Sequence, residues 1–98
     1  MKILGGYTYI LTNKTNRVLY CGVTDNLARR IYEHKQEIVP GFTAKYHAHK
    51  LVWYEHYERI EYAIAREKQL KAGSRKKKVD LITAMNPDWN DLYEDITF

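Results

Sequence analysis

Two runs of aromatic and β-branched residues lie close together near the start of the chain, at 7–12 (YTYILT) and 18–23 (VLYCGV). Such residues favour strands, and the polar link NKTNR between the runs is short enough for a β-hairpin. Pairing of Thr12 with Arg17 would place Tyr9 opposite Tyr20, with both side chains on one face of the sheet. A slip by one residue would turn one of these tyrosines to the other face.

A helix is expected after the hairpin, from an N-cap at Thr24 or Asp25 to about Ile38, before Pro40 and Gly41. Its apolar stripe at helical spacing consists of Leu27, Ile31 and Ile38. At about 100° per residue, Arg30 and His34 fall within this stripe. A charged group on a packing face is costly unless it meets a partner, so these two residues need an explanation.

The rest of the chain indicates one more strand and several helices. The expected elements are a loop or short helical turn at 41–50, a strand at 51–57 (LVWYEHY), helices at about 60–72 and 75–85 separated by Gly73 as C-cap and Ser74 as N-cap, and a last helical turn within 87–96. The order β-β-α-β-α-α predicts an α+β fold with a small three-stranded antiparallel sheet flanked by helices. We expect a single domain over residues 1–98.

Glu67 is a third polar residue beside an apolar stripe, because it lies between Ile60, Ile64 and Lys71 on the later helix. Two interpretations stay open. Arg30 and Glu67 form a buried ion pair that only orders the fold, and the tyrosines and His34 are packed core residues. Alternatively an acid, a base-capable group, a fixed cation and two phenols from several elements converge on a functional site.

The charge distribution indicates a surface for a polyanion. The net charge is +4, but the run REKQLKAGSRKKK from Arg66 to Lys78 contains Glu67 as its one acidic residue, and no Lys or Arg follows it. A basic stripe of this kind suits a phosphate backbone, although a solvated helical face would look the same. The candidate nucleic-acid contacts are Lys71, Arg75, Lys76, Lys77 and Lys78.

Cysteine content and hydropathy limit where the chain acts. Cys21 is the sole cysteine, so no disulfide within the chain is possible and a cytoplasmic location is expected. No apolar run reaches the ~20 residues needed to span a bilayer, and the start MKILGGYTYIL lacks the features of a signal peptide. A zinc site from His47, His49, His56 and Cys21 has no standard spacing, so we do not expect one.

The chain resembles the GIY-YIG nuclease family over nearly its whole length. Tyr7-Thr8-Tyr9 stands for the first half of the signature and Tyr20-Cys21-Gly22 for the second, with eleven positions from Tyr9 to Tyr20. Arg30 follows Gly22 by eight positions at the place of the family's arginine, and His34 four residues later at that of its helix histidine or tyrosine. The stretches GFTAKY, LVWYE, REKQLK, GSRKKK and NPDWNDL also look like the small stand-alone members.

The resemblance implies a metal-dependent endonuclease acting on DNA, with Tyr9, Tyr20, Arg30, His34 and Glu67 as catalytic residues. It implies that Glu67 binds Mg²⁺ or Mn²⁺ as the single protein ligand, that Arg30 holds the phosphate, and that one tyrosine, Tyr9 by preference, is the general base. Val23 stands where some members have a lysine, and neither Asn86 nor Asn90 has a convincing spacing for the family's late asparagine. A catalytically inactive DNA-binding module of the same fold is the alternative.

Overall fold

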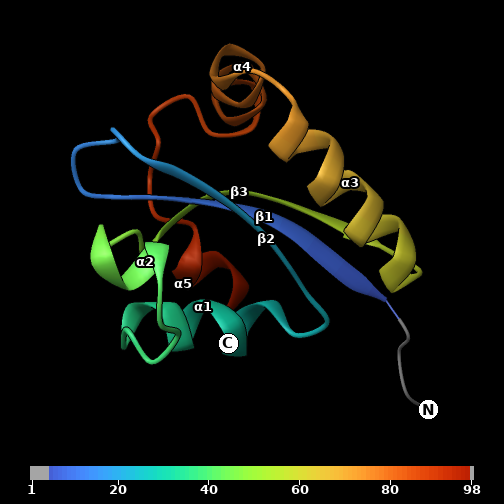
Figure 1. Cartoon of the computed structure of the whole chain (residues 1–98), viewed down its shortest axis with the longest axis horizontal. Helices are drawn as coiled ribbons and strands as arrows, with labels where there is room; N and C mark the ends of the chain where they lie inside the picture. Colours follow the sequence, from blue (N-terminus) through green and yellow to red (C-terminus); the bar gives the residue numbers. More distant parts are fainter. Residues whose placement is uncertain (1–4, 98) are drawn as a thin grey trace.

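A three-stranded antiparallel sheet in the order β2-β1-β3 forms the centre of the fold, as the sequence predicted (Figure 1). The strands are β1 (Gly6–Thr12), β2 (Leu19–Thr24) and β3 (Lys50–Tyr57). The structure is a computed structural model and describes residues 5–97. Because β1 lies in the middle, β2 and β3 are the edge strands of the sheet. The functional side chains described below gather near β2.

Helices cover both faces of the sheet (Figure 1). One layer contains α1 (Leu27–Lys35), α2 (Phe42–Lys45) and α5 (Tyr93–Ile96), and the other contains α3 (Ile60–Ala72) and α4 (Arg75–Met85). Residues alternate between the layers along β1, since Tyr9 and Leu11 pack against α1 while Ile10 packs against α3 and α4. The protein therefore has two cores, one on each side of the sheet.

The hairpin register differs from the predicted one by two residues. Tyr9 pairs with Gly22, and Tyr20 pairs with Leu11. The turn is wider than expected because Oδ1 of Asn13 accepts a hydrogen bond from the Arg17 backbone N–H at 2.8 Å. This hydrogen bond keeps Arg17 out of the strand. A shift by an even number preserves the faces, so Tyr9 and Tyr20 still lie on one side, as predicted.

Both ends of α1 differ from the sequence prediction. Asn26 is the N-cap, in place of Thr24 or Asp25, and its Oδ1 accepts from the Arg29 backbone at 3.1 Å. The helix ends at Lys35, and Ile38 is 64% exposed, so it is not part of the apolar stripe. The early end follows from the left-handed backbone two residues later, at φ 56°.

The later helices match the prediction closely. α3 ends at Ala72 with Gly73 as its C-cap, and Ser74 caps α4 by accepting from the Lys77 backbone at 3.2 Å. Ile64, expected on the apolar side of α3, is 38% exposed. Asn86 is buried at the end of α4 and donates to the Val52 carbonyl of β3, so its amide has a structural role. Within residues 5–97, no helix combines the length and apolar character of a membrane span.

Candidate active site

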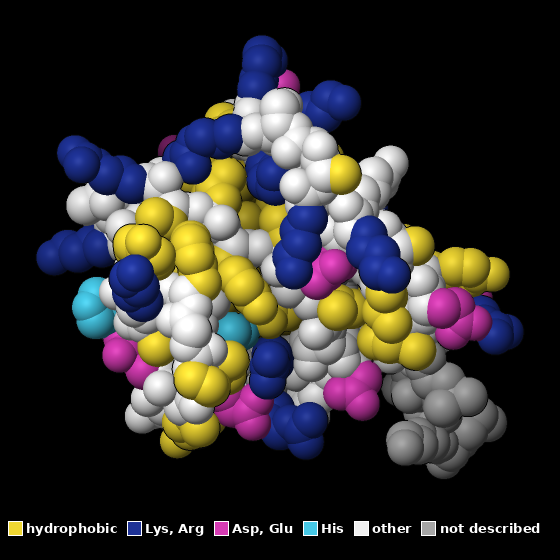
Figure 2. All heavy atoms as spheres, in the orientation of Figure 1, with side chains coloured by type: hydrophobic (Ala, Val, Ile, Leu, Met, Phe, Trp, Pro, Cys, Tyr) yellow, Lys and Arg dark blue, Asp and Glu magenta, His cyan; other side chains and the backbone are white. Residues whose placement is uncertain are grey.

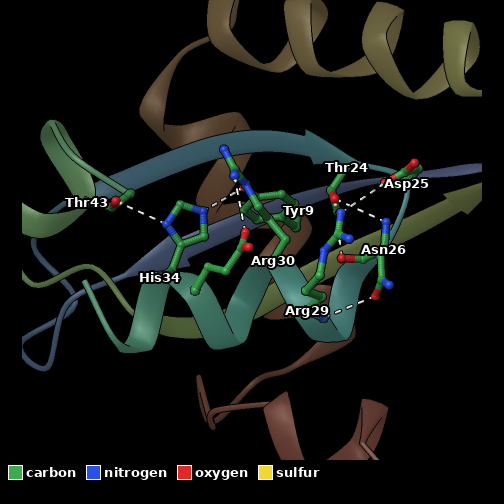
Figure 3. Close-up of polar contacts among 9 residues, drawn as sticks. Tyr9, Thr24, Asp25, Asn26, Arg29, Arg30, His34 and Thr43 are labelled. Atoms are coloured by element: carbon green, nitrogen blue, oxygen red, sulfur yellow. Dashed lines mark hydrogen bonds and ion pairs between the residues drawn. The ribbon is translucent and has the colours of Figure 1, made fainter. Parts of the chain in front are cut away.

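Tyr9 and His34 form a buried hydrogen-bonded pair between β1 and α1 (Figure 3). The Tyr9 hydroxyl lies 2.8 Å from Nε2 of His34, and each residue is 1% exposed. On its other side, Nδ1 of His34 lies 3.1 Å from Oγ1 of Thr43 in α2. The imidazole is therefore held at both nitrogens, by groups from two different elements.

The Arg30 guanidinium lies against this pair. It is beside the Tyr9 hydroxyl and bonds Oε1 of Glu33 at 3.4 Å. Arginine can only donate, so a hydrogen bond between Arg30 and Tyr9 is accepted by the phenol oxygen. Either neutral tautomer of His34 satisfies both of its contacts, because the hydroxyls of Tyr9 and Thr43 can each donate or accept. The imidazole therefore joins the phenol to α2 through two hydrogen bonds.

Burial keeps both members of the pair neutral. It raises the pKa of Tyr9 to about 12, although the neighbouring Arg30 acts in the opposite direction. It lowers the pKa of His34 to about 4, and the positive charge of Arg30 adds to this effect. At neutral pH the phenol is protonated and the imidazole is uncharged, so the two are joined by a hydrogen bond between neutral groups.

Tyr20 and Gly22 complete the sheet side of the site. The Tyr20 ring lies 6.4 Å from the Tyr9 ring and 5.7 Å from the His34 ring, measured between centroids. Gly22 lies under the Tyr9 ring, where an added Cβ would be 2.3 Å from Cζ. Thr8 and Cys21, which replace the isoleucines of the signature, face the other way: Thr8 donates to the Ala63 carbonyl of α3, and Cys21 packs in the α3 and α4 core.

Glu67 reaches the same region from the opposite layer. Its side chain is 16% exposed, and its Oε2 lies 3.0 Å from Nζ of Lys71. The same Lys71 Nζ lies 5.9 Å from the centroid of the Tyr20 ring, so the carboxylate lies near the tyrosines, and its negative charge adds to the raised pKa of Tyr9. The buried Arg30–Glu67 ion pair that the sequence left open is not formed, because Arg30 pairs with Glu33 and its side chain is 37% exposed.

The carboxylate of Glu67 suits a hard divalent cation. Mg²⁺ and Mn²⁺ prefer oxygen ligands and accept a site with one protein carboxylate, the other positions being taken by water and phosphate. Lys71, the partner of Glu67, is 53% exposed and sits on a flexible side chain that can leave the carboxylate. The donor set therefore fits the metal that the sequence resemblance implies.

The predicted basic residues separate into groups. Lys71 and Lys78 line a pocket of ≈ 330 Å³ that includes Tyr20, so they lie beside the site. Arg75 donates to the Asn16 carbonyl in the hairpin turn at 3.0 Å. Two more residues of the run lie farther along α4: Lys76 pairs with Asp80 at 2.8 Å, and Lys77 lines a second pocket, between α3 and α4, which Lys78 also borders.

Sequence reasoning missed two features of this face. Thr43, which holds His34, was part of the quoted stretch GFTAKY, but its role depends on a contact that spacing does not reveal. His47 and His49 meet Glu37, with ligand atoms within 4.8 Å of one another. The zinc set with Cys21 does not form, because Cys21 lies in the core on the other face of the sheet.

Comparisons with known proteins identify the family of the chain. Residues 5–80 match the family model described as the GIY-YIG catalytic domain. A UPF0213 protein of Clostridium perfringens is 36% identical over 78 residues, which cover 80% of this chain and 83% of that protein. The solution NMR structure of a UPF0213 protein from Bacillus halodurans has a TM-score of 0.57 and 26% identity, covering 96% of this chain and 99% of that one. The chain belongs to the GIY-YIG family and carries its nuclease-type catalytic domain.

Proposed function

We propose that the protein is a metal-dependent endonuclease that hydrolyses phosphodiester bonds in DNA. The observation that carries the proposal is the buried Tyr9–His34 hydrogen bond, which lies next to the Arg30 guanidinium and within range of the Glu67 carboxylate. A base, a proton acceptor behind it, a cation and a metal ligand are the groups that hydrolysis of a phosphodiester needs.

Tyr9 and His34 move the proton of the attacking water. As the Tyr9 oxygen takes a proton from water, its own proton passes to Nε2 of His34 over the 2.8 Å hydrogen bond. Burial lowers the pKa of His34 to about 4, so the imidazole is a weak base and the transfer has to be coupled to attack of the water on the phosphate. Thr43 keeps the imidazole aligned through its hydrogen bond with Nδ1. Tyr9 thus acts as the general base, and His34 as the relay behind it.

Arg30, Tyr20 and Glu67 act on the phosphate. Arg30 is partly exposed, so its guanidinium can bind a phosphate oxygen and stabilise the charge that develops in the transition state. Tyr20 faces the same space and orients the water or the phosphate. Glu67 would hold a divalent cation, Mg²⁺ or Mn²⁺, and that cation would supply Lewis acidity.

The basic side chains around the site bind the DNA backbone. Lys71 and Lys78 lie closest to Tyr20, and Arg75, Lys76 and Lys77 extend the positive surface along α4. Contacts of this kind bind phosphates and not bases, so we propose low sequence specificity.

Cys21 is a free, buried thiol, which is in keeping with the cytoplasmic location expected from the sequence.

The variant Glu67→Gln tests this proposal, with Glu61→Gln as the matched control on the same helix. Glu61 is on the first turn of α3 and pairs with Arg59, away from the site. We expect Glu67→Gln to abolish metal-dependent cleavage of labelled DNA with its melting temperature preserved, while Glu61→Gln cleaves like the wild type. Cleavage retained in Glu67→Gln would remove that residue from the mechanism. DNA binding by the wild type without cleavage in either metal would select the inactive binding module.

A further inference from the structure

Three aromatic rings form a row that begins at the active site. The Tyr20 and Phe42 rings stack with their centroids 6.1 Å apart and their planes inclined by 23°, and the Phe42 and Tyr46 centroids are 4.7 Å apart. We call Tyr20, Phe42 and Tyr46 the aromatic platform. Tyr20 belongs both to this row and to the site, since its ring is 5.7 Å from that of His34.

The platform is open to solvent at its outer end. Phe42 is 43% exposed and Tyr46 is 41% exposed, which is a large apolar area to leave in water next to a catalytic pair. In Figure 2, hydrophobic side chains gather on the face that carries α2 and are bordered by Lys and Arg side chains. The Trp53 ring of β3, in contrast, is 4% exposed and belongs to the core.

The position of the platform is tied to that of the catalytic histidine. Phe42 and Thr43 are adjacent in α2, and Thr43 is buried against His34 with a hydrogen bond of 3.1 Å. Turning α2 by one residue would break this bond and carry Phe42 away from Tyr20. The rings therefore stand in a set place relative to the phenol that accepts the water proton.

Positive charge lies along the same row. Nζ of Lys71 is 5.9 Å from the centroid of the Tyr20 ring, and Nζ of Lys45 is 5.3 Å from that of Tyr46. Lys78 lines the pocket of ≈ 330 Å³ together with Phe42 and Tyr20. Flat apolar faces alternating with cations suit a ligand that alternates flat rings with anions.

We propose that the aromatic platform stacks unpaired bases of a single DNA strand, while the lysines bind the phosphates between them. In a duplex the base faces are covered by their neighbours, so a duplex would present only charged backbone to these rings. A single strand offers both groups. The inference rests on the proposed function, because it assumes that a DNA strand lies across the Tyr9 site. It adds that this strand is unpaired next to the bond that is cut.

Binding in the presence of EDTA tests the platform without any chemistry. Fluorescence anisotropy compares a short labelled single strand with a duplex of the same sequence, for the wild type, Phe42→Leu and Tyr46→Leu. Leucine keeps apolar bulk and removes the ring face. The control is Tyr62→Leu, because Tyr62 is 58% exposed and lies in a pocket on the β3 side of α3. Melting temperatures establish that each variant is folded.

We expect the wild type to prefer the single strand, and each platform variant to lose about 5-fold or more of that affinity, with duplex binding unchanged. Tyr62→Leu should bind like the wild type. Equal affinity of the wild type for both forms, or single-strand binding unaffected in both platform variants, would overturn the inference even if the protein cleaves DNA. Absence of cleavage with Mg²⁺ or Mn²⁺, with the binding preference intact, would refute the endonuclease proposal and leave the platform standing.

Discussion

Replacing Gly22 by alanine perturbs the site through a single methyl group. The added Cβ would lie 2.3 Å from Cζ and 2.4 Å from the hydroxyl oxygen of Tyr9. Non-bonded carbon atoms settle at about 3.5–4.0 Å, so the Tyr9 ring has to move by roughly 1 Å or more. The ring is 1% exposed and is packed against α1, so there is no open space for it to enter.

The cost of this change has two parts. Overpacking in a close-packed interior costs about 1–3 kcal/mol. Displacing the phenol also weakens its hydrogen bond to His34, and a buried group left unpaired costs about 1–3 kcal/mol more. We expect Gly22→Ala to lower the free energy of unfolding by about 3 kcal/mol. For a domain of this size that corresponds to a fall in melting temperature of roughly 12–24 °C. DNA cleavage should be lost even below that temperature.

Urea denaturation and a cleavage assay measure the two effects, and Gly73→Ala is the matched control. A Cβ at Gly73 would meet its nearest neighbour at 3.5 Å, and the backbone φ there is −82°, which alanine adopts freely. The free energy of unfolding of Gly73→Ala should stay within about 0.5 kcal/mol of the wild-type value. A double-mutant cycle with Tyr9→Leu isolates the clash: Gly22→Ala should cost about 1–2 kcal/mol less in that background. Wild-type stability of Gly22→Ala would refute the placement of the Tyr9 ring over this strand.

Three further predictions concern the groups around this ring. Because the pKa of His34 is lowered to about 4, the unfolded chain binds more protons than the native one between about pH 4 and 6.5, so the free energy of unfolding should fall by up to about 3 kcal/mol as pH drops through that window. In denaturation experiments across this range, the free energy of unfolding of His34→Gln should depend less on pH, and the same pH dependence as in the wild type would contradict the assignment. Thr43→Val removes the hydrogen-bond partner of His34 Nδ1 at constant shape, so the free energy of unfolding should fall by about 1–2 kcal/mol in denaturation experiments, with slower cleavage. Lys71→Ala and Lys78→Ala should each reduce the slope of log affinity for DNA against log salt concentration by roughly 0.7–0.9. Lys76 pairs with Asp80 outside the pocket, so Lys76→Ala should reduce this slope less, and equal effects of all three variants would refute a localised contact.

Local signals in the sequence were enough to predict the elements of this fold. Aromatic and β-branched runs mark the strands, and Ser74 marks the start of α4 through its side-chain cap. The facing of Tyr9 and Tyr20 was also predicted correctly, although the assumed register was wrong by two residues. A register error of two residues leaves both side chains on the same face of the sheet, whereas an error of one would have turned one of the tyrosines to the opposite face.

What the sequence could not predict depends on long-range contacts. Helical periodicity placed Arg30 on the apolar face of α1, but a long side chain can reach solvent from such a position, and Arg30 does so. Periodicity also could not show that Glu67 is paired with Lys71 and not with Arg30. The contact between Thr43 and His34 joins two elements through a loop, and no spacing rule encodes it.

The placement of the site at the β2 edge links catalysis to the docking of the two helical layers. Tyr9, Tyr20, Arg30 and His34 all precede the end of β3, and Glu67 follows it in α3. A cut between β3 and α3 would leave one fragment with the phenols and the guanidinium and another with the carboxylate. Neither fragment would hold the complete set of groups, so restored cleavage on mixing them would report their association. Association of the two helical layers is therefore a condition for the proposed activity.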